Sequence, residues 1–146
     1  MNKENAIERM RMLAEARVPF LHQGRDFSGI DCIGALAFAL QYDKDIPAYP
    51  RDPINGELEK ELQRVIGLPI IEVKKYEPLT TTELLQPLDI LAMQYRGPMR
   101  HVAMVVPHIS IPNVLSVIHT DSILGRVTEH ILDRKWLARV VKVWRP

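Results

Sequence analysis

The stretch Ser28-Gly29-Ile30-Asp31-Cys32-Ile33-Gly34, followed directly by Ala35-Leu36-Ala37-Phe38-Ala39-Leu40, is the part of the sequence around which the predicted fold is built. It predicts a turn, then Asp31 as the N-terminal cap of a helix, then a helix that is apolar on almost every side and therefore central and buried. Cys32, the only cysteine of the chain, falls in the first turn of this helix. The N–H groups and the positive end of the helix dipole favour a thiolate at that position. Cys32 is therefore a candidate nucleophile, and the alternative is a cysteine that serves only packing in the core.

The composition limits the classes of protein to which the chain can belong. Its 146 residues are enough for one domain, residues 1–146, and 47% hydrophobic with 25% charged residues is typical of a soluble globular protein. The formal net charge of +1 gives no electrostatic reason to expect a nucleic-acid partner. Residues 1–9 lack the apolar segment of a secretory signal, and no apolar run approaches the roughly 20 residues that span a bilayer. We therefore expect synthesis in the cytoplasm without a signal peptide, and no membrane insertion.

Helical signals occupy the first half of the chain and strand signals the second. The spacing of apolar residues predicts a helix over 4–17, and Asn55 is expected to cap a helix over 57–66. Short segments rich in branched residues predict strands at 89–95, 101–106, 114–119, 126–131 and 140–144, with a helical turn over 133–138. Helices followed by a run of strands predict an α+β fold, in which the Cys32 helix packs on an antiparallel sheet of about five strands.

The five histidines supply the candidate bases that a cysteine nucleophile requires. His101 opens one predicted strand, and His119 closes the next. A hairpin that pairs residue 106 with residue 114 places these two imidazoles directly opposite each other. The loop is not a defined tight turn, so a slip of one or two residues in the register stays open. If this edge of the sheet meets the helix N-terminus, a Cys–His–His site results, in which Asp121 or a main-chain group is the alternative partner of His101.

Other polar residues near the predicted site have both a functional and a structural interpretation. His22 either shapes the entrance loop or touches substrate. Asp31 either only caps the helix or also receives a substrate ammonium group. Arg25 and Arg100 either attract an acidic peptide or remain solvated.

The remaining histidine and metal interpretations are weaker. His108 and His130 are expected to be surface groups. A zinc site made from Cys32, His101 and His119 is chemically allowable, but the chain lacks the closely paired ligands of structural zinc modules. We therefore expect no metal.

Several segments, in order, resemble one known family. Pro19-Phe20-Leu21-His22-Gln23-Gly24-Arg25, together with Ser28-Gly29-Ile30-Asp31-Cys32-Ile33-Gly34, is similar to the nucleophile region of NlpC-type, papain-like cell-wall cysteine peptidases. Pro87-Leu88-Asp89-Ile90-Leu91, His101-Val102-Ala103-Met104 and Ile118-His119-Thr120 follow in the family's order. The His22-Gln23-Gly24-Arg25 stretch and the closing Glu129-His130-Ile131-Leu132-Asp133-Arg134-Lys135-Trp136 resemble the short, phage-encoded branch most. The resemblance extends over residues 10–145.

The resemblance implies a papain-like fold, a role for each site residue and a substrate class. Cys32 would attack a peptide carbonyl, His101 would be the general base and later the acid, and His119 would orient His101. The substrate would be a peptidoglycan stem peptide, and no metal or other cofactor would be required. The resemblance also implies association with a phage or prophage tail, whose proteins would be partners and whose delivery inside a virion would bypass secretion.

Three residues depart from the family pattern. Phe20 stands where a tyrosine is usual, Ile33 replaces a small polar residue after the cysteine, and Leu88 replaces a glycine, which is expected to change the backbone locally. With Phe20, the residues His22, Arg25 and Asp31 form the predicted substrate-binding set. Two alternatives stay open: a non-enzymatic tail assembly component that keeps the fold, and an acyltransferase or amidase that uses the same Cys–His–His site on another substrate.

Overall fold

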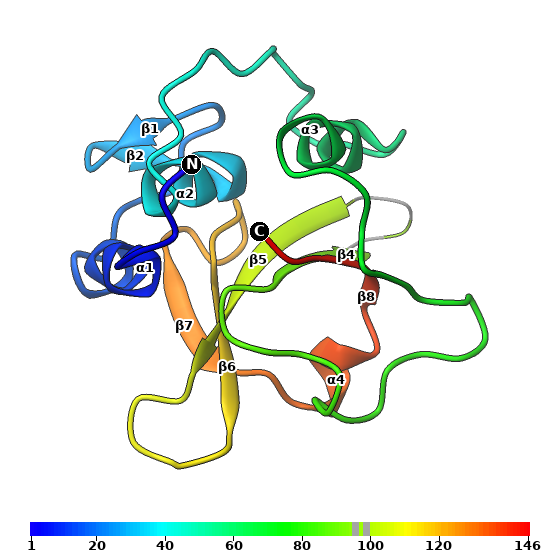
Figure 1. Cartoon of the computed structure of the whole chain (residues 1–146). Helices are drawn as coiled ribbons and strands as arrows, with labels where there is room; N and C mark the ends of the chain where they lie inside the picture. Colours follow the sequence, from blue (N-terminus) through cyan, green and yellow to red (C-terminus); the bar gives the residue numbers. More distant parts are fainter. Residues whose placement is uncertain (95–96, 98–99) are drawn as a thin grey trace.

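An antiparallel sheet of six strands forms the centre of the computed structural model, which describes residues 1–94, 97 and 100–146 (Figure 1). The strand order is β3-β8-β4-β5-β6-β7, with β3 at Ile71–Glu72, β4 at Ile90–Gln94, β5 at Arg100–Pro107, β6 at Leu115–His119, β7 at Thr128–Ile131 and β8 at Val140–Trp144. The short strands β1 (Arg25–Asp26) and β2 (Gly29–Ile30) pair separately. The predicted α+β class is confirmed. The prediction of about five strands missed β3, whose two residues are too few to show alternation. The end of the predicted strand 89–95, at Tyr95, lies outside the described residues.

Four helices pack around this sheet: α1 (Ala6–Glu15), α2 (Cys32–Ala39), α3 (Glu57–Val65) and α4 (Arg134–Leu137). The start of α2 is as predicted, because Asp31 has an extended backbone and its side chain accepts a hydrogen bond of 2.8 Å from the Gly34 N–H. The cap of α3 differs from the prediction. Gly56, with φ of 76°, occupies the cap position in place of Asn55, since glycine adopts this left-handed backbone without strain.

Alternation along β5 divides its side chains between two cores. Val102 and Met104 pack against α2, which contributes Ile33 and other apolar side chains to the same core. Ala103 and Val105 face the opposite way, into a core shared with β4, β6, β8 and α4. Burial of each large aliphatic side chain stabilises the fold by about 1.5–3 kcal/mol. The N-terminus of α2 is therefore held firmly beside the first residues of β5.

The register of the β5–β6 hairpin differs from the predicted one by two residues. Val106 pairs with Ser116 rather than with Val114. The strands extend further because the His108 N–H donates to the Val114 carbonyl at 2.8 Å, and Asn113 turns the loop with φ of 63°. A slip of two residues keeps every side chain on its face of the sheet. The two predicted histidines therefore remain on one face, but diagonal to each other.

Leu88, the residue that replaces a family glycine, lies just before β4. Its φ of 80° is left-handed, a backbone conformation that costs a leucine about 1–2 kcal/mol. The Leu88 N–H donates to the Val105 carbonyl at 2.8 Å, and its side chain packs against the core beneath α2. Leucine here adopts the backbone conformation for which glycine is suited, and the expected local change relative to the family stays a prediction.

Asp89, the next residue, fixes the same end of β4 through an ion pair. Its carboxylate is fully buried and accepts two hydrogen bonds from the Arg145 guanidinium, at 2.8 and 2.9 Å. This bidentate pair ties the start of β4 to the residue that follows β8.

Across the described ranges, none of the helices has the length and apolar character that crossing a bilayer would require.

Candidate active site at the N-terminus of α2

Cys32 and His101 line the same small pocket, with a volume of about 40 Å³. Phe20, His22, Asp31, Tyr49, Thr120 and Asp121 are among the other residues around it. The pocket lies where the first turn of α2 meets the start of β5, so the expected meeting of the helix N-terminus and the sheet edge is observed. Cys32 is partly exposed there.

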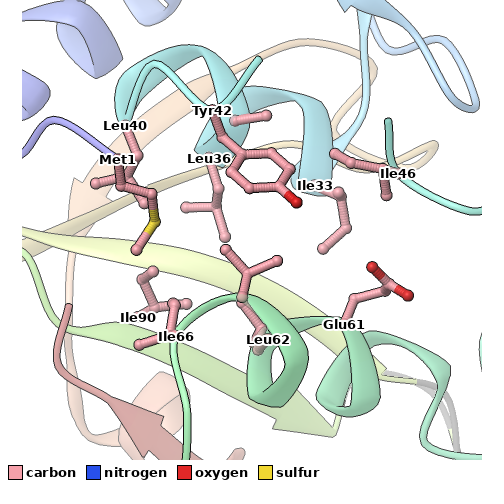
Figure 2. A pocket seen from close by; sticks show the side chains of 12 residues that line it. Met1, Ile33, Leu36, Leu40, Tyr42, Ile46, Glu61, Leu62, Ile66 and Ile90 are labelled. Carbon is pink, nitrogen blue, oxygen red and sulfur yellow. The ribbon is translucent and has the colours of Figure 1, made fainter. Parts of the chain in front are cut away.

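A second pocket, of about 50 Å³, lies between α2 and α3 (Figure 2). Apolar side chains dominate its lining, among them Ile33, Leu36, Leu62 and Ile90, and Glu61 stands at its edge. Among the described residues that line it there is no histidine and no cysteine. It therefore offers a small, mainly apolar surface, whereas a thiol and an imidazole come together only at the Cys32 pocket among the pockets described.

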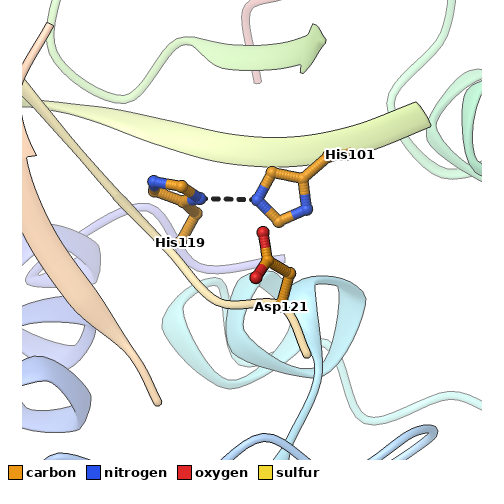
Figure 3. A group of neighbouring side chains, drawn as sticks. All are labelled: His101, His119 and Asp121. Atoms are coloured by element: carbon orange, nitrogen blue, oxygen red, sulfur yellow. Dashed lines mark hydrogen bonds between the residues drawn. The ribbon is translucent and has the colours of Figure 1, made fainter. Parts of the chain in front are cut away.

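His101 and His119 are hydrogen-bonded to each other (Figure 3). The Nε2 atom of His101 lies 2.6 Å from the Nδ1 atom of His119, and the two residues are 3% and 0% exposed. The prediction that the two imidazoles lie side by side is confirmed, although the contact is diagonal between strands. Such a contact holds the plane of the His101 ring, which is what an orienting residue must do.

Asp121 is the third member of this group (Figure 3). The ligand atoms of His101, His119 and Asp121 all lie within 4.8 Å of one another. Oδ1 of Asp121 accepts hydrogen bonds from the backbone N–H groups of Ile123 and Leu124, at 2.8 and 2.7 Å. Within the described part of the chain, its Oδ2 is buried without a hydrogen-bond partner. Asp121 therefore remains a second group beside His101, as the sequence left open.

Burial favours the neutral forms of Cys32 and His101. It raises the pKa of Cys32 to about 12, with a further contribution from the Asp31 charge, against backbone hydrogen bonds from Val102 and Ile33 that favour the thiolate. Burial lowers the pKa of His101 to about 4, although the Asp121 charge acts in the opposite direction. The expectation that the helix N-terminus yields a thiolate is therefore wrong for the resting state.

Asp31 is the centre of a saturated hydrogen-bond network. Its Oδ1 accepts from the Gly34 N–H at 2.8 Å and from Nη1 of Arg25 at 2.9 Å. Its Oδ2 accepts from the Gln23 N–H at 2.8 Å and from the Tyr49 hydroxyl. Burial and the Asp31 charge raise the pKa of Tyr49, which therefore stays a donor. The cap role is confirmed, whereas the contact of Asp31 with a substrate ammonium group stays a prediction.

The other predicted substrate-binding residues are divided between the pocket and its support. Phe20 and His22 line the pocket, and the His22 ring meets the Tyr49 ring edge-on with centroids 5.6 Å apart. Arg25 lies behind Asp31, which it contacts as an ion pair, and its Nη2 donates to the Tyr49 hydroxyl at 3.1 Å. Arg100 lines the pocket and pairs with Glu59 at 3.2 Å.

His130 is a residue that sequence reasoning missed, since it was expected at the surface. It is only half-buried, but its Nε2 lies 2.6 Å from Nε2 of His119, and its Nδ1 donates to the Ile131 carbonyl at 2.9 Å. Trp136 contacts both rings, edge-on to His119 with centroids 5.0 Å apart and tilted against His130 with centroids 4.7 Å apart. The strand at 126–131 was predicted, but only its pairing, with His130 opposite Val117, reveals the contact.

The donor set that comes closest to a metal site is His101, His119 and Asp121, without Cys32. Two imidazole nitrogens on one zinc ion stand roughly 3.3 Å apart, because each Zn–N bond is about 2.0–2.1 Å and the geometry is tetrahedral. The facing nitrogens of His101 and His119 are closer, at 2.6 Å, and share a hydrogen bond. The arrangement therefore fits a hydrogen-bonded pair better than a pair of ligands to one ion.

Comparison with known proteins adds no family assignment. The chain matches no protein-family model, and it matches no curated protein. The likeness to NlpC-type peptidases rests on the motifs quoted above, and chemical conclusions must come from the geometry around Cys32.

Proposed function

We propose that the protein is a thiol-dependent hydrolase of amide bonds, with Cys32 as nucleophile, His101 as proton carrier and His119 as its orienting partner. One observation carries the proposal: Cys32, in the first turn of α2, shares a pocket with a buried imidazole that a second imidazole holds at 2.6 Å. Nucleophile, base and orienting group in this relation are the requirements for cysteine-based acyl transfer.

The proposed reaction has two halves. The Cys32 sulfur attacks the amide carbon as His101 takes the thiol proton, and the backbone N–H of Cys32 at the helix start stabilises the oxyanion. The C–N bond then breaks, and His101 returns its proton to the leaving amine, which leaves a thioester. In the second half His101 takes a proton from water, the hydroxide attacks the thioester, and the acid leaves as Cys32 recovers its proton.

Peptidoglycan stem peptides are the substrate class that the motif resemblance favours, with a phage or prophage tail as the setting. Purified stem peptides incubated with the protein should yield new amine ends, detected by mass spectrometry. Cys32→Ser is the matched variant, because it changes one atom and removes the thiol. Cleavage by Cys32→Ser at the rate of the unchanged protein would contradict the proposal.

The non-enzymatic alternative is favoured by the burial of Cys32, which raises the pKa of its thiol to about 12 and disfavours the thiolate at neutral pH. Alkylation of Cys32 by iodoacetamide separates the two. The rate should rise about tenfold for each pH unit between 7 and 10 in either case. In a hydrolase, a stem peptide in the pocket protects Cys32 from alkylation and His101→Ala slows it. If neither has an effect, the non-enzymatic component is the better description. If His101→Ala slows the alkylation of Cys32 but no stem peptide is cleaved, an acyltransferase or amidase is the better description.

A further inference from the structure

We propose that His130 is a positioning residue that sets the tautomer of His101 through His119. This inference rests on the proposed hydrolase function for its catalytic meaning, but the tautomer itself is a property of the resting protein. It assigns a role to a half-buried histidine on β7, the strand that pairs with β6 and is separated by it from β5.

The physical basis is a continuous chain of three imidazoles across neighbouring strands. His101 on β5 contacts His119 on β6 at 2.6 Å, and His119 contacts His130 on β7, also at 2.6 Å. Each contact joins ring nitrogen to ring nitrogen, so one partner must donate and the other accept. At the far end, Nδ1 of His130 lies 2.9 Å from the Ile131 carbonyl oxygen.

The Ile131 carbonyl determines which nitrogen donates at each contact along the three imidazoles, because a carbonyl oxygen can only accept a hydrogen bond. Nδ1 of a neutral His130 must therefore carry the proton, which leaves its Nε2 as an acceptor. His119 must then donate from Nε2, so its Nδ1 accepts. His101 in turn must donate from Nε2.

This arrangement of hydrogens decides the state of Nδ1, the other ring nitrogen of His101. With the proton on Nε2, the Nδ1 atom of His101 carries the lone pair, and it is turned away from His119 (Figure 3). A general base needs that lone pair to take the Cys32 proton. If the chain ran in the opposite direction, Nδ1 of His101 would carry a hydrogen and could not accept it. Asp121 is the competing influence, because its carboxylate faces the same ring.

Nitrogen NMR of the protein with ¹⁵N-labelled histidine tests this inference at a pH where the rings are neutral. Two-bond proton–nitrogen correlations distinguish the tautomers, and spectra of the His101→Gln and His130→Gln variants assign the signals. We expect the Nε2–H form for His101 and His119 and the Nδ1–H form for His130. His130→Leu removes the acceptor, so the Nδ1–H form of His101 should become populated. His130→Gln offers a side-chain carbonyl at the position of Nε2 and should restore the unchanged pattern.

Hydrolysis supplies the second readout. His130→Leu should lower kcat on a stem peptide about tenfold, less than the full loss of proton-transfer catalysis because His101 is still present, with KM unchanged, and His130→Gln should recover it. An Nδ1–H form of His101 in the unchanged protein, or an unchanged tautomer in folded His130→Leu, overturns the inference and assigns the role to Asp121. Absence of hydrolysis with the expected tautomers would instead contradict the proposed function.

Discussion

Two polar networks lie on either side of Cys32, and they are built in opposite ways. The carboxylate of Asp31 accepts two hydrogen bonds on each oxygen, and one of the donors is the cationic Arg25. The histidine chain from His101 to His130 joins ring nitrogen to ring nitrogen at 2.6 Å, and its last ring donates to the Ile131 carbonyl. In the first network a carboxylate only accepts hydrogen bonds, whereas in the second the donor at each contact depends on the tautomers of the rings. We infer that the Asp31 network stabilises the fold and that the histidine chain carries the chemistry.

The largest expected effect is the loss of catalysis in His101→Ala. Removal of the base should reduce the rate of stem-peptide hydrolysis by about a thousandfold, within the range found for general-base catalysis. The measurement is kcat/KM by quantification of the released amine, with urea unfolding as the control for folding. More than about a tenth of the original rate would place the base elsewhere.

The largest effect on stability is expected for Asp31→Ala. It removes the cap of α2 and leaves the Arg25 charge and the Tyr49 hydroxyl without their shared acceptor, so the free energy of unfolding should fall by about 3 kcal/mol. Urea denaturation measures this. Asp26→Ala is the matched control, because Asp26 is an exposed carboxylate that accepts hydrogen bonds from its near neighbours Ser28 and Gly29. Equal losses in the two variants would contradict the structural role of Asp31.

Acid should weaken the histidine chain. Burial lowers the pKa of His101 to about 4 and also lowers the pKa of His119. The unfolded chain binds these protons near pH 6.5, so from about pH 6.5 down to 4 the unfolded state binds more protons and the free energy of unfolding falls as the pH falls. The slope should be about 1.4 kcal/mol per pH unit for each ring. In His119→Asn, the free energy of unfolding from urea at pH 7, 6 and 5 should depend less steeply on pH. A slope equal to that of the unchanged protein would count against a buried, neutral His119.

The smallest effect is expected for Tyr49→Phe. The change removes one of the four donors to Asp31 and keeps the ring, so the free energy of unfolding should fall by about 1 kcal/mol. Urea unfolding is again the measurement, and the rate of hydrolysis should stay near that of the unchanged protein. A loss as large as that of Asp31→Ala would mean that Tyr49, rather than the carboxylate, holds the network together.

The parts of the fold that local sequence controls could be predicted. The Asp31 cap, the helix that follows it and the five long strands each depend on patterns within a few residues. The register of the β5–β6 hairpin could not be predicted, because it depends on how residues 108–114 fold as a loop. The missed site residues share one cause. His130 and Tyr49 reach His119 and Asp31 only through pairing and loop closure, which no spacing along the chain records.

The contact of Trp136 with two histidines makes intrinsic tryptophan fluorescence a probe of the histidine chain. Of the two tryptophans in the chain, Trp144 is fully buried and donates through Nε1 to the Gly67 carbonyl at 2.9 Å, so its emission is a steady background. Trp136 lies against both His119 and His130. Because an imidazolium quenches indole fluorescence and a neutral imidazole does so far less, the emission of Trp136 should follow the arrival of a proton in the histidine chain. Stopped-flow fluorescence can therefore time the arrival of a proton in the histidine chain without any attached dye.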